Sequence, residues 1–124
     1  MEIEKLICDD CLIMRLRGEL DHHQAEQVRA AADEALQDKG LQRLILNLGG
    51  LSFMDSAGIG VILGRYKQMQ QRQGQMAICE IPRAVAKVLE ISGIPRVIPF
   101  YKSEIEALRQ TARGAAVKRR ARQR

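Results

Sequence analysis

The spacing of apolar residues switches repeatedly along this chain between the two-residue period of strands and the three-to-four-residue period of helices. Residues 3–7 and 12–16 both alternate, and Asp9–Asp10 separates them, which predicts a hairpin whose second strand ends at Gly18. Short, nearly continuous apolar runs predict three further strands, at residues 44–46, 76–79 and 97–98.

Four segments carry apolar residues on one helical face, which predicts helices at residues 21–39, 56–73, 82–92 and 103–112. The first and last open with capping-box spacings, Asp21 to Gln24 and Ser103 to Glu106, and Gly40 closes the first. The order β-β-α-β-α-β-α-β-α predicts an α/β fold. We expect a mostly parallel sheet of four to five strands with an antiparallel N-terminal edge and four helices.

Basic charge is concentrated at the C-terminal end of the chain. The net charge is +5, but six of the twenty basic residues lie in 113–124, which leaves fourteen basic and fifteen acidic residues in 1–112. The end segment lacks apolar periodicity and aromatic residues, so we expect a folded domain over 1–112 and a disordered, solvated tail over 113–124. Nonspecific contact of the tail with nucleic acid is the alternative, and no specific nucleic-acid partner is expected.

Cysteine usage and hydropathy indicate the setting. The odd count of three cysteines argues against a disulfide framework and for a reducing compartment. No apolar run approaches the roughly 18 to 20 residues of a membrane span, and charges interrupt the N-terminal apolar residues at once, unlike a signal peptide. We therefore expect a cytoplasmic protein with no membrane partner.

The motifs of several enzyme classes are absent. A nucleophile elbow requires Gly-x-Ser-x-Gly, but Met54 occupies the first glycine position before Ser56. Gly58, Gly60 and Gly64 have neither the dinucleotide-binding spacing nor a P-loop lysine, so they are predicted to let a neighbouring element approach the helix closely.

The remaining reactive side chains also have structural interpretations. Cys8 and Cys11 have redox spacing, but the acids between them disfavour a thiolate, and too few further ligands exist for zinc. His22 and His23 are interpreted as polar residues of a helix start. We expect no enzymatic activity, no metal and no cofactor.

Sites in open α/β sheets lie beyond the carboxyl ends of the parallel strands. Three connections should emerge there: residues 19–22, 53–56 and 80–82. The glycines at 49–50 are expected to turn the chain after the central strand, and Phe53 and Met54 to anchor the next loop as apolar plugs. Ser56 would then be presented rigidly. Asp55 has two interpretations, a helix N-cap or a group that assists chemistry at Ser56.

Two stretches, RGELDHHQAEQVR (17–29) and LILNLGGLSFMDSAGIGVILGRYKQM (44–69), resemble the STAS domain family. Within that family the likeness is to the anti-sigma factor antagonists of sporulation. The resemblance covers about residues 1–112. It is carried by the Asp-Ser-small-Gly-Ile-Gly core together with Gly-Glu-Leu-Asp-His-His and Gly-Arg-Tyr-Lys. Many relatives have a second serine where this chain has Ala57, and the basic segment after Arg113 has no counterpart in the family pattern.

The resemblance implies a partner-switching regulator that is phosphorylated at Ser56. The implied partner is an anti-sigma factor that is also a serine kinase and supplies ATP and Mg²⁺. The unphosphorylated form binds this kinase and releases the sigma factor, phosphorylation abolishes binding, and a separate serine phosphatase resets the switch. The free protein is expected to be a monomer. The expected partner surface comprises Asp21, His22, His23, Asp55, Ser56, Ala57, Gly58, Ile59 and Ile81.

Two alternatives stay open. The chain could be a STAS module of another pathway, such as a stress response or the regulation of a transporter, in which the same loop binds a different protein. It could also be a STAS domain that binds a small ligand or a nucleotide in the strand-end cleft.

Overall fold

The computed structural model describes the backbone of residues 1–122 and the side chains of residues 1–116. Within residues 1–122 the elements, in chain order, are β1 (Glu2–Cys8), β2 (Cys11–Leu20), α1 (Ala25–Ala35), β3 (Arg43–Met54), α2 (Ser56–Gln71), β4 (Gln75–Cys79), α3 (Arg83–Ser92), the 3₁₀ turn η1 (Ile94–Arg96), β5 (Phe100–Tyr101) and α4 (Glu104–Arg122). None of these helices is long and apolar enough to span a membrane.

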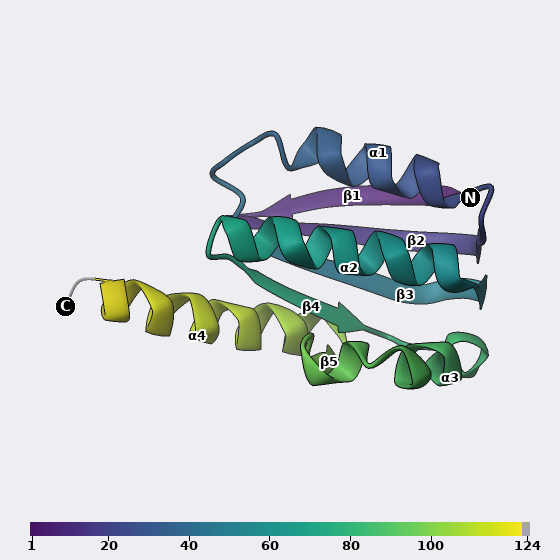
Figure 1. Ribbon diagram of the computed structural model, residues 1–124. Helices are drawn as coiled ribbons and strands as arrows, with labels where there is room; N and C mark the ends of the chain where they lie inside the picture. The colour runs from purple at the N-terminus through teal and green to yellow at the C-terminus, as the bar shows by residue number, and fades with distance from the viewer. Residues whose placement is uncertain (123–124) are drawn as a thin grey trace.

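The strands of the described chain form one five-stranded sheet in the order β1-β2-β3-β4-β5 (Figure 1). The β1–β2 pair is antiparallel and every later pair is parallel, which confirms the predicted α/β fold with its antiparallel N-terminal edge. The predicted hairpin is also confirmed. Its turn places Asp9 at φ 54°, a left-handed conformation that aspartate tolerates better than most residues.

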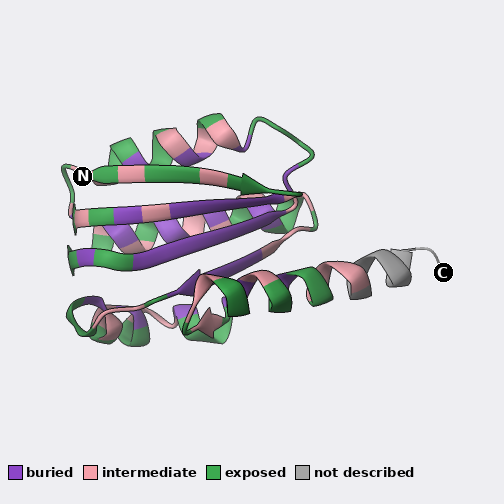
Figure 2. Cartoon of the chain, turned by 180° about the vertical axis from the view of Figure 1, so that it is seen from behind, coloured by how far each residue is buried: buried purple, intermediate pink, exposed green. Residues whose placement is uncertain are grey.

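Two apolar clusters lie on opposite sides of the sheet. The larger joins strand residues such as Leu12, Leu46 and Ile78 to α1, α2 and α3, and we call this side the front face. The smaller contains Ile13, Ile45 and residues of α4, so α4 packs on the back face. Figure 2 shows the sheet from behind, with the central strands buried and β1 largely exposed.

Two strands extend further than the sequence predicts. Gly18 does not end β2; it adopts φ 119° and the strand runs on to Leu20. The predicted turn at residues 49–50 is wrong, because β3 continues to Met54 and stays paired with β2 throughout. A shift in the β2–β3 register at Leu48–Gly49, rather than a turn, accommodates the glycines, and a second shift follows at Ser52.

Two boundaries were also predicted wrongly. Helix α1 ends at Ala35, and a turn follows in which the Asp38 carboxylate accepts a hydrogen bond from the Gly40 amide at 2.9 Å. Gly93, at φ 82°, ends α3 and leads into η1, so the last strand lies at Phe100–Tyr101 instead of residues 97–98. At both places residues that favour turns, Asp38 and Gly93, set the element boundary, although the apolar pattern predicts another position.

Helix α4 corrects the prediction of a disordered tail for residues 113–122. It continues to Arg122 and extends past the end of the sheet (Figures 1 and 2). Once a packed helix exists, each added residue costs little, and the Ala- and Arg-rich sequence favours continuation. Residues 123–124 lie outside the described residues, and the domain boundary near residue 112 stays a prediction.

Candidate functional site

The connection from β3 to α2 presents Ser56. Asp55 is the N-cap of α2: its backbone is extended and its carboxylate oxygen Oδ1 accepts a hydrogen bond from the Ala57 amide at 2.9 Å. Ser56 is the first residue of the helix and is exposed. An exposed hydroxyl therefore lies at a helix start, where amide groups without intrahelical partners and the helix dipole favour a negative charge.

Asp55 also holds a second loop in place. Its other carboxylate oxygen, Oδ2, accepts a hydrogen bond from the His22 amide at 3.1 Å, and its own amide donates to the Leu20 carbonyl at 3.3 Å. The structure therefore brings together two of the connections that the sequence places at the strand ends. Because a backbone amide occupies each carboxylate oxygen, the capping interpretation of Asp55 gains support over a chemical role.

The loop between β2 and α1 is shaped by Asp21. Its Oδ1 accepts a hydrogen bond from the Gln24 amide at 3.0 Å, and its carbonyl accepts from the Gln24 and Ala25 amides. Asp21 thus stabilises the turn before α1, but the N-cap of the helix is Gln24, which has no side-chain cap hydrogen bond. The prediction that the helix begins at residue 21 with Asp21 in a capping box is therefore wrong. His22 and His23 are exposed, with ring centroids 5.6 Å apart in an edge-on arrangement.

The first turn of α2 is partly a packing surface. A side chain at Gly58 would place its Cβ 2.7 Å from Met54 Cγ and 3.0 Å from Leu20 Cγ, so the predicted close approach occurs there. The same prediction is wrong for Gly60 and Gly64, where an added Cβ would have no neighbour within 4 Å. Ala57 and Ile59 are half-buried beside Ser56, while Gly58 is buried.

Ile81 belongs to the third connection, which emerges elsewhere. The ladder between β3 and β4 ends at the pair Asn47–Cys79, although β3 itself runs on to Met54. Ile81 is half-buried and packs against the larger apolar cluster. The partner-binding role of all these residues stays a prediction.

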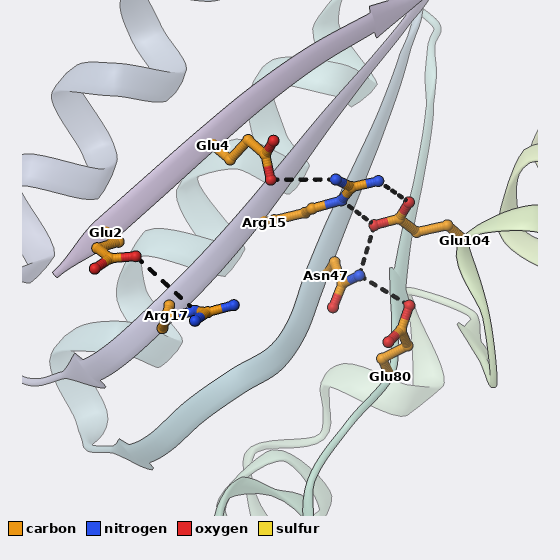
Figure 3. Close-up of polar contacts among 7 residues, drawn as sticks. All are labelled: Glu2, Glu4, Arg15, Arg17, Asn47, Glu80 and Glu104. Atoms are coloured by element: carbon orange, nitrogen blue, oxygen red, sulfur yellow. Dashed lines mark hydrogen bonds and ion pairs between the residues drawn. The ribbon is translucent and has the colours of Figure 1, made fainter.

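Sequence reasoning missed a polar network on the back face, drawn in Figure 3. The Arg15 guanidinium binds both Glu104 carboxylate oxygens, at 2.7 and 2.8 Å, and Glu4 at 3.1 Å. The Asn47 amide nitrogen donates to Glu104 at 2.6 Å and to Glu80 at 2.9 Å. An arginine in β2 was visible in the sequence, but its two partners, Glu4 and Glu104, lie in β1 and at the start of α4.

Electrostatics stabilise this network. The hydrogen bonds from Arg15, with a contribution from Asn47, lower the pKa of Glu104, and those from Glu104 and Glu4 raise the pKa of Arg15. A cavity of about 600 Å³ beside the network is also lined by Arg17 and Gly50. Among the described residues no cluster of histidine, cysteine, aspartate and glutamate could hold a metal ion.

The cysteines fit the interpretation of inert thiols. Cys11 and Cys79 are buried, and removal from water raises the pKa of each thiol to about 12. Neither residue is a reactive thiolate near neutral pH. Cys8 is exposed and unpaired with another cysteine.

Comparison with known proteins gives concordant matches. The family model of the STAS domain matches residues 2–107. A protein named anti-sigma F factor antagonist, from Paenibacillus polymyxa, is 47% identical over 97 residues, which cover 78% of this chain and 83% of that protein.

Two solved structures of SpoIIAA are also similar to this chain. That of the anti-sigma factor antagonist SpoIIAA in its unphosphorylated form has a TM-score of 0.71 and 28% identity, and covers 91% of this chain and 99% of the other. That of the Bacillus cell fate determinant SpoIIAA in the phosphorylated form has a TM-score of 0.70 and 31% identity, and covers 88% and 98%.

Proposed function

This chain belongs to the STAS domain family, and from that membership we propose that it is an anti-sigma factor antagonist switched by phosphorylation of Ser56. The unphosphorylated form binds an anti-sigma factor that is also a serine kinase, and so releases a sporulation sigma factor. Phosphorylation of Ser56 ends the binding, and a serine phosphatase restores it.

The observation that carries the proposal is the exposed Ser56 hydroxyl at the first residue of α2, next to a loop that Asp55 fixes. The name of the Paenibacillus polymyxa relative supports the antagonist role. SpoIIAA, which is 31% identical, has been solved in a phosphorylated form, which supports regulation by phosphorylation.

The chemical step belongs to the partner. The Ser56 hydroxyl oxygen attacks the γ-phosphorus of ATP held with Mg²⁺ in the kinase. The new O–P bond forms as the bond between the γ-phosphorus and its bridging oxygen to the β-phosphate breaks. ADP leaves, and the hydroxyl proton passes to a base of the kinase or to water. This chain contributes the positioned hydroxyl and needs no cofactor of its own.

The switch follows from charge. A phosphoserine carries about −1.5 to −2 charges at neutral pH, and at position 56 it would stand directly beside Asp55. The start of α2 tolerates the anion, so the fold stays intact. A docked partner would have to desolvate both negative groups. An unpaired charge at an interface costs several kcal/mol, and each 1.4 kcal/mol lowers affinity tenfold.

The partner surface is proposed to surround Ser56. Its nearest members are Asp21, His22, His23, Ala57 and Ile59, which flank the hydroxyl on the two loops and the first turn of α2. Neither a specific nucleic acid nor a membrane is part of the proposal, and the free chain is proposed to be a cytoplasmic monomer.

The test is to incubate the purified chain with the serine-kinase anti-sigma factor of its organism and ATP. Mass spectrometry should find one phosphate, on Ser56. The Ser56→Ala variant should gain none. Ser52→Ala is the matched control, because Ser52 is also exposed and lies just before the loop, and it should be phosphorylated like the parent chain.

Binding completes the test. The unmodified chain should bind the kinase in isothermal titration calorimetry, and the phosphorylated chain should bind at least tenfold more weakly. An active kinase that leaves the chain unmodified, or that binds both forms equally well, contradicts the proposal.

A further inference from the structure

Phe53 is an exposed aromatic residue beside the proposed phosphorylation site. It is the penultimate residue of β3 and is 44% exposed, whereas Met54, which follows it, is 2% exposed. Phe53 is a member of neither apolar cluster of the described chain. The expectation that it anchors the loop as an apolar plug is therefore wrong, and a large apolar side chain is left available to solvent.

A bulge in β3 turns Phe53 outward. Gly18 pairs with Leu51 and Glu19 pairs with Phe53, so Ser52 is an extra residue on the β3 side. Side chains alternate along a regular strand, which would place Phe53 on the same face as the buried Leu51. The extra residue shifts the alternation by one, so that Met54 enters the core and Phe53 faces away from it.

From this we propose that Phe53 is an apolar anchor for the kinase partner, inserted into an apolar recess of that protein next to its active site. The inference rests on the proposed function, because it names a residue through which the same partner contacts the loop that carries Ser56. It assigns to Phe53 a role in affinity and none in the phosphoryl transfer itself.

The distance along the chain supports this assignment. Phe53 lies three positions before Ser56, so their Cα atoms are no more than about 11 Å apart. A standard protein interface buries about 800 Å² on each partner, roughly a disc of 16 Å radius. An interface of this size centred near Ser56 is therefore wide enough to include Phe53.

The surroundings have the composition of an interface. Aromatic residues are enriched in interfaces, and polar, solvent-accessible residues form the rims of interfaces. Glu19 lies opposite Phe53, and Arg17, with a 76% exposed side chain, approaches its ion-pair partner only to 3.9 Å. The partner that fits this surface has an apolar recess bordered by polar and charged groups.

Among the described residues, Ile7 is an exposed large apolar residue that lies away from the Ser56 loop. Ile7 is 64% exposed in β1 and pairs with Leu12, near the start of β2, whereas Phe53 pairs near the end of β2. Ile7 therefore lies at the opposite end of the sheet and provides a matched control: a more exposed apolar side chain outside the proposed contact.

The kinetic experiment compares phosphorylation of the full chain and of Phe53→Ala, Phe53→Leu and Ile7→Ala by the same kinase. We expect Phe53→Ala to raise KM for the protein substrate about tenfold or more while kcat changes less than about twofold. Phe53→Leu should recover much of the loss, and Ile7→Ala should match the parent chain. Circular dichroism checks that each variant is folded.

A second measurement uses the unmutated protein. The sequence contains two phenylalanines, Phe53 and the half-buried Phe100, so selective labelling gives two sets of ring signals in NMR. Saturating amounts of the kinase should shift the ring signals of Phe53 more than those of Phe100.

The possible outcomes are distinct. Normal KM in Phe53→Ala, or unchanged Phe53 signals on binding, overturns the inference and leaves phosphorylation of Ser56 intact. A loss of affinity equal in Ile7→Ala also overturns it, because the effect would then not be local. If the parent chain is neither bound nor phosphorylated, the proposed function and the inference both fail.

Discussion

Asp55 and His22 are joined by a hydrogen bond of 3.1 Å from the His22 amide to the Asp55 carboxylate, across 33 positions of the sequence. The same carboxylate caps α2 through the Ala57 amide at 2.9 Å. One side chain therefore ties the β2–α1 loop to the start of the helix that carries Ser56. A rigid loop pair lowers the entropy that a partner must remove on binding.

Replacing Asp55 should destabilise the fold. Asp55→Ala removes the N-cap and the acceptor for His22, and we expect the free energy of unfolding to fall by about 1 to 2 kcal/mol. Asp55→Asn keeps one acceptor oxygen, so its free energy of unfolding should fall by less than that of Asp55→Ala. Urea unfolding followed by circular dichroism measures both changes. Glu34→Ala, an exposed change on α1, is the control and should stay within about 0.5 kcal/mol. Equal stability of Asp55→Ala and the parent chain would contradict the role of the Asp55 hydrogen bonds in stabilising the fold.

Adding a negative charge at Ser56 should leave the fold unchanged. Ser56→Asp places a carboxylate at the first residue of α2, where the helix dipole favours it, and the side chain is exposed. The circular dichroism spectrum should match that of the parent chain, and the free energy of unfolding should stay within about 0.5 kcal/mol. Affinity for the kinase should fall while Ser56→Ala still binds. Loss of secondary structure in Ser56→Asp would contradict a switch that acts only at the interface.

The glycines of α2 should respond in opposite directions to alanine. Gly58→Ala places a Cβ 2.7 Å from Met54 Cγ, and such overpacking costs about 1 to 3 kcal/mol. In Gly60→Ala the added Cβ has no neighbouring atom within 4 Å, so the free energy of unfolding should rise by up to about 1 kcal/mol from helix propensity. Thermal unfolding of the two variants measures the contrast. A stabilised Gly58→Ala would show that the helix start moves away from Met54 freely.

The contribution of Glu104 should depend on pH. Arg15 lowers the pKa of Glu104 in the folded chain, so the ionised carboxylate stabilises the fold above its unfolded pKa of about 4.3. This stability is lost as the pH falls through the lowered folded pKa. Glu104→Gln should therefore unfold about 1 kcal/mol more easily at pH 7, a modest cost because Arg15 is partly in water.

Urea unfolding at several pH values from 7 to 3 measures the difference in the free energy of unfolding between Glu104→Gln and the parent chain. The difference should shrink below about pH 4, where the carboxyl group of the parent chain becomes protonated. Glu90→Gln, at an exposed position of α3, should show little difference at any pH. A difference in the free energy of unfolding that stays constant to pH 3 would mean that the ion pair with Arg15 contributes nothing to stability.

The kinds of elements and their order could be predicted from the sequence alone. The alternation around Leu12 predicts a strand and the helical spacing from Ile59 to Met69 predicts a helix, because both patterns reflect which side of one element is buried. The cap of α2 was equally local: Asp55 binds the Ala57 amide two residues ahead, so residue type and spacing identified it. The same reasoning failed at Asp21, because α1 begins later and its N-cap is Gln24.

Only the tertiary structure decided which distant groups meet. The bulge at Ser52 that exposes Phe53 exists because β3 must stay in register with β2, and a shift of one residue exchanges the two faces of a strand. The contact of Asp55 with His22 and that of Glu104 with Arg15 likewise depend on how separate elements pack. Local patterns report the burial of a residue's own element, whereas register and side-chain partners depend on strands and helices far away in the sequence.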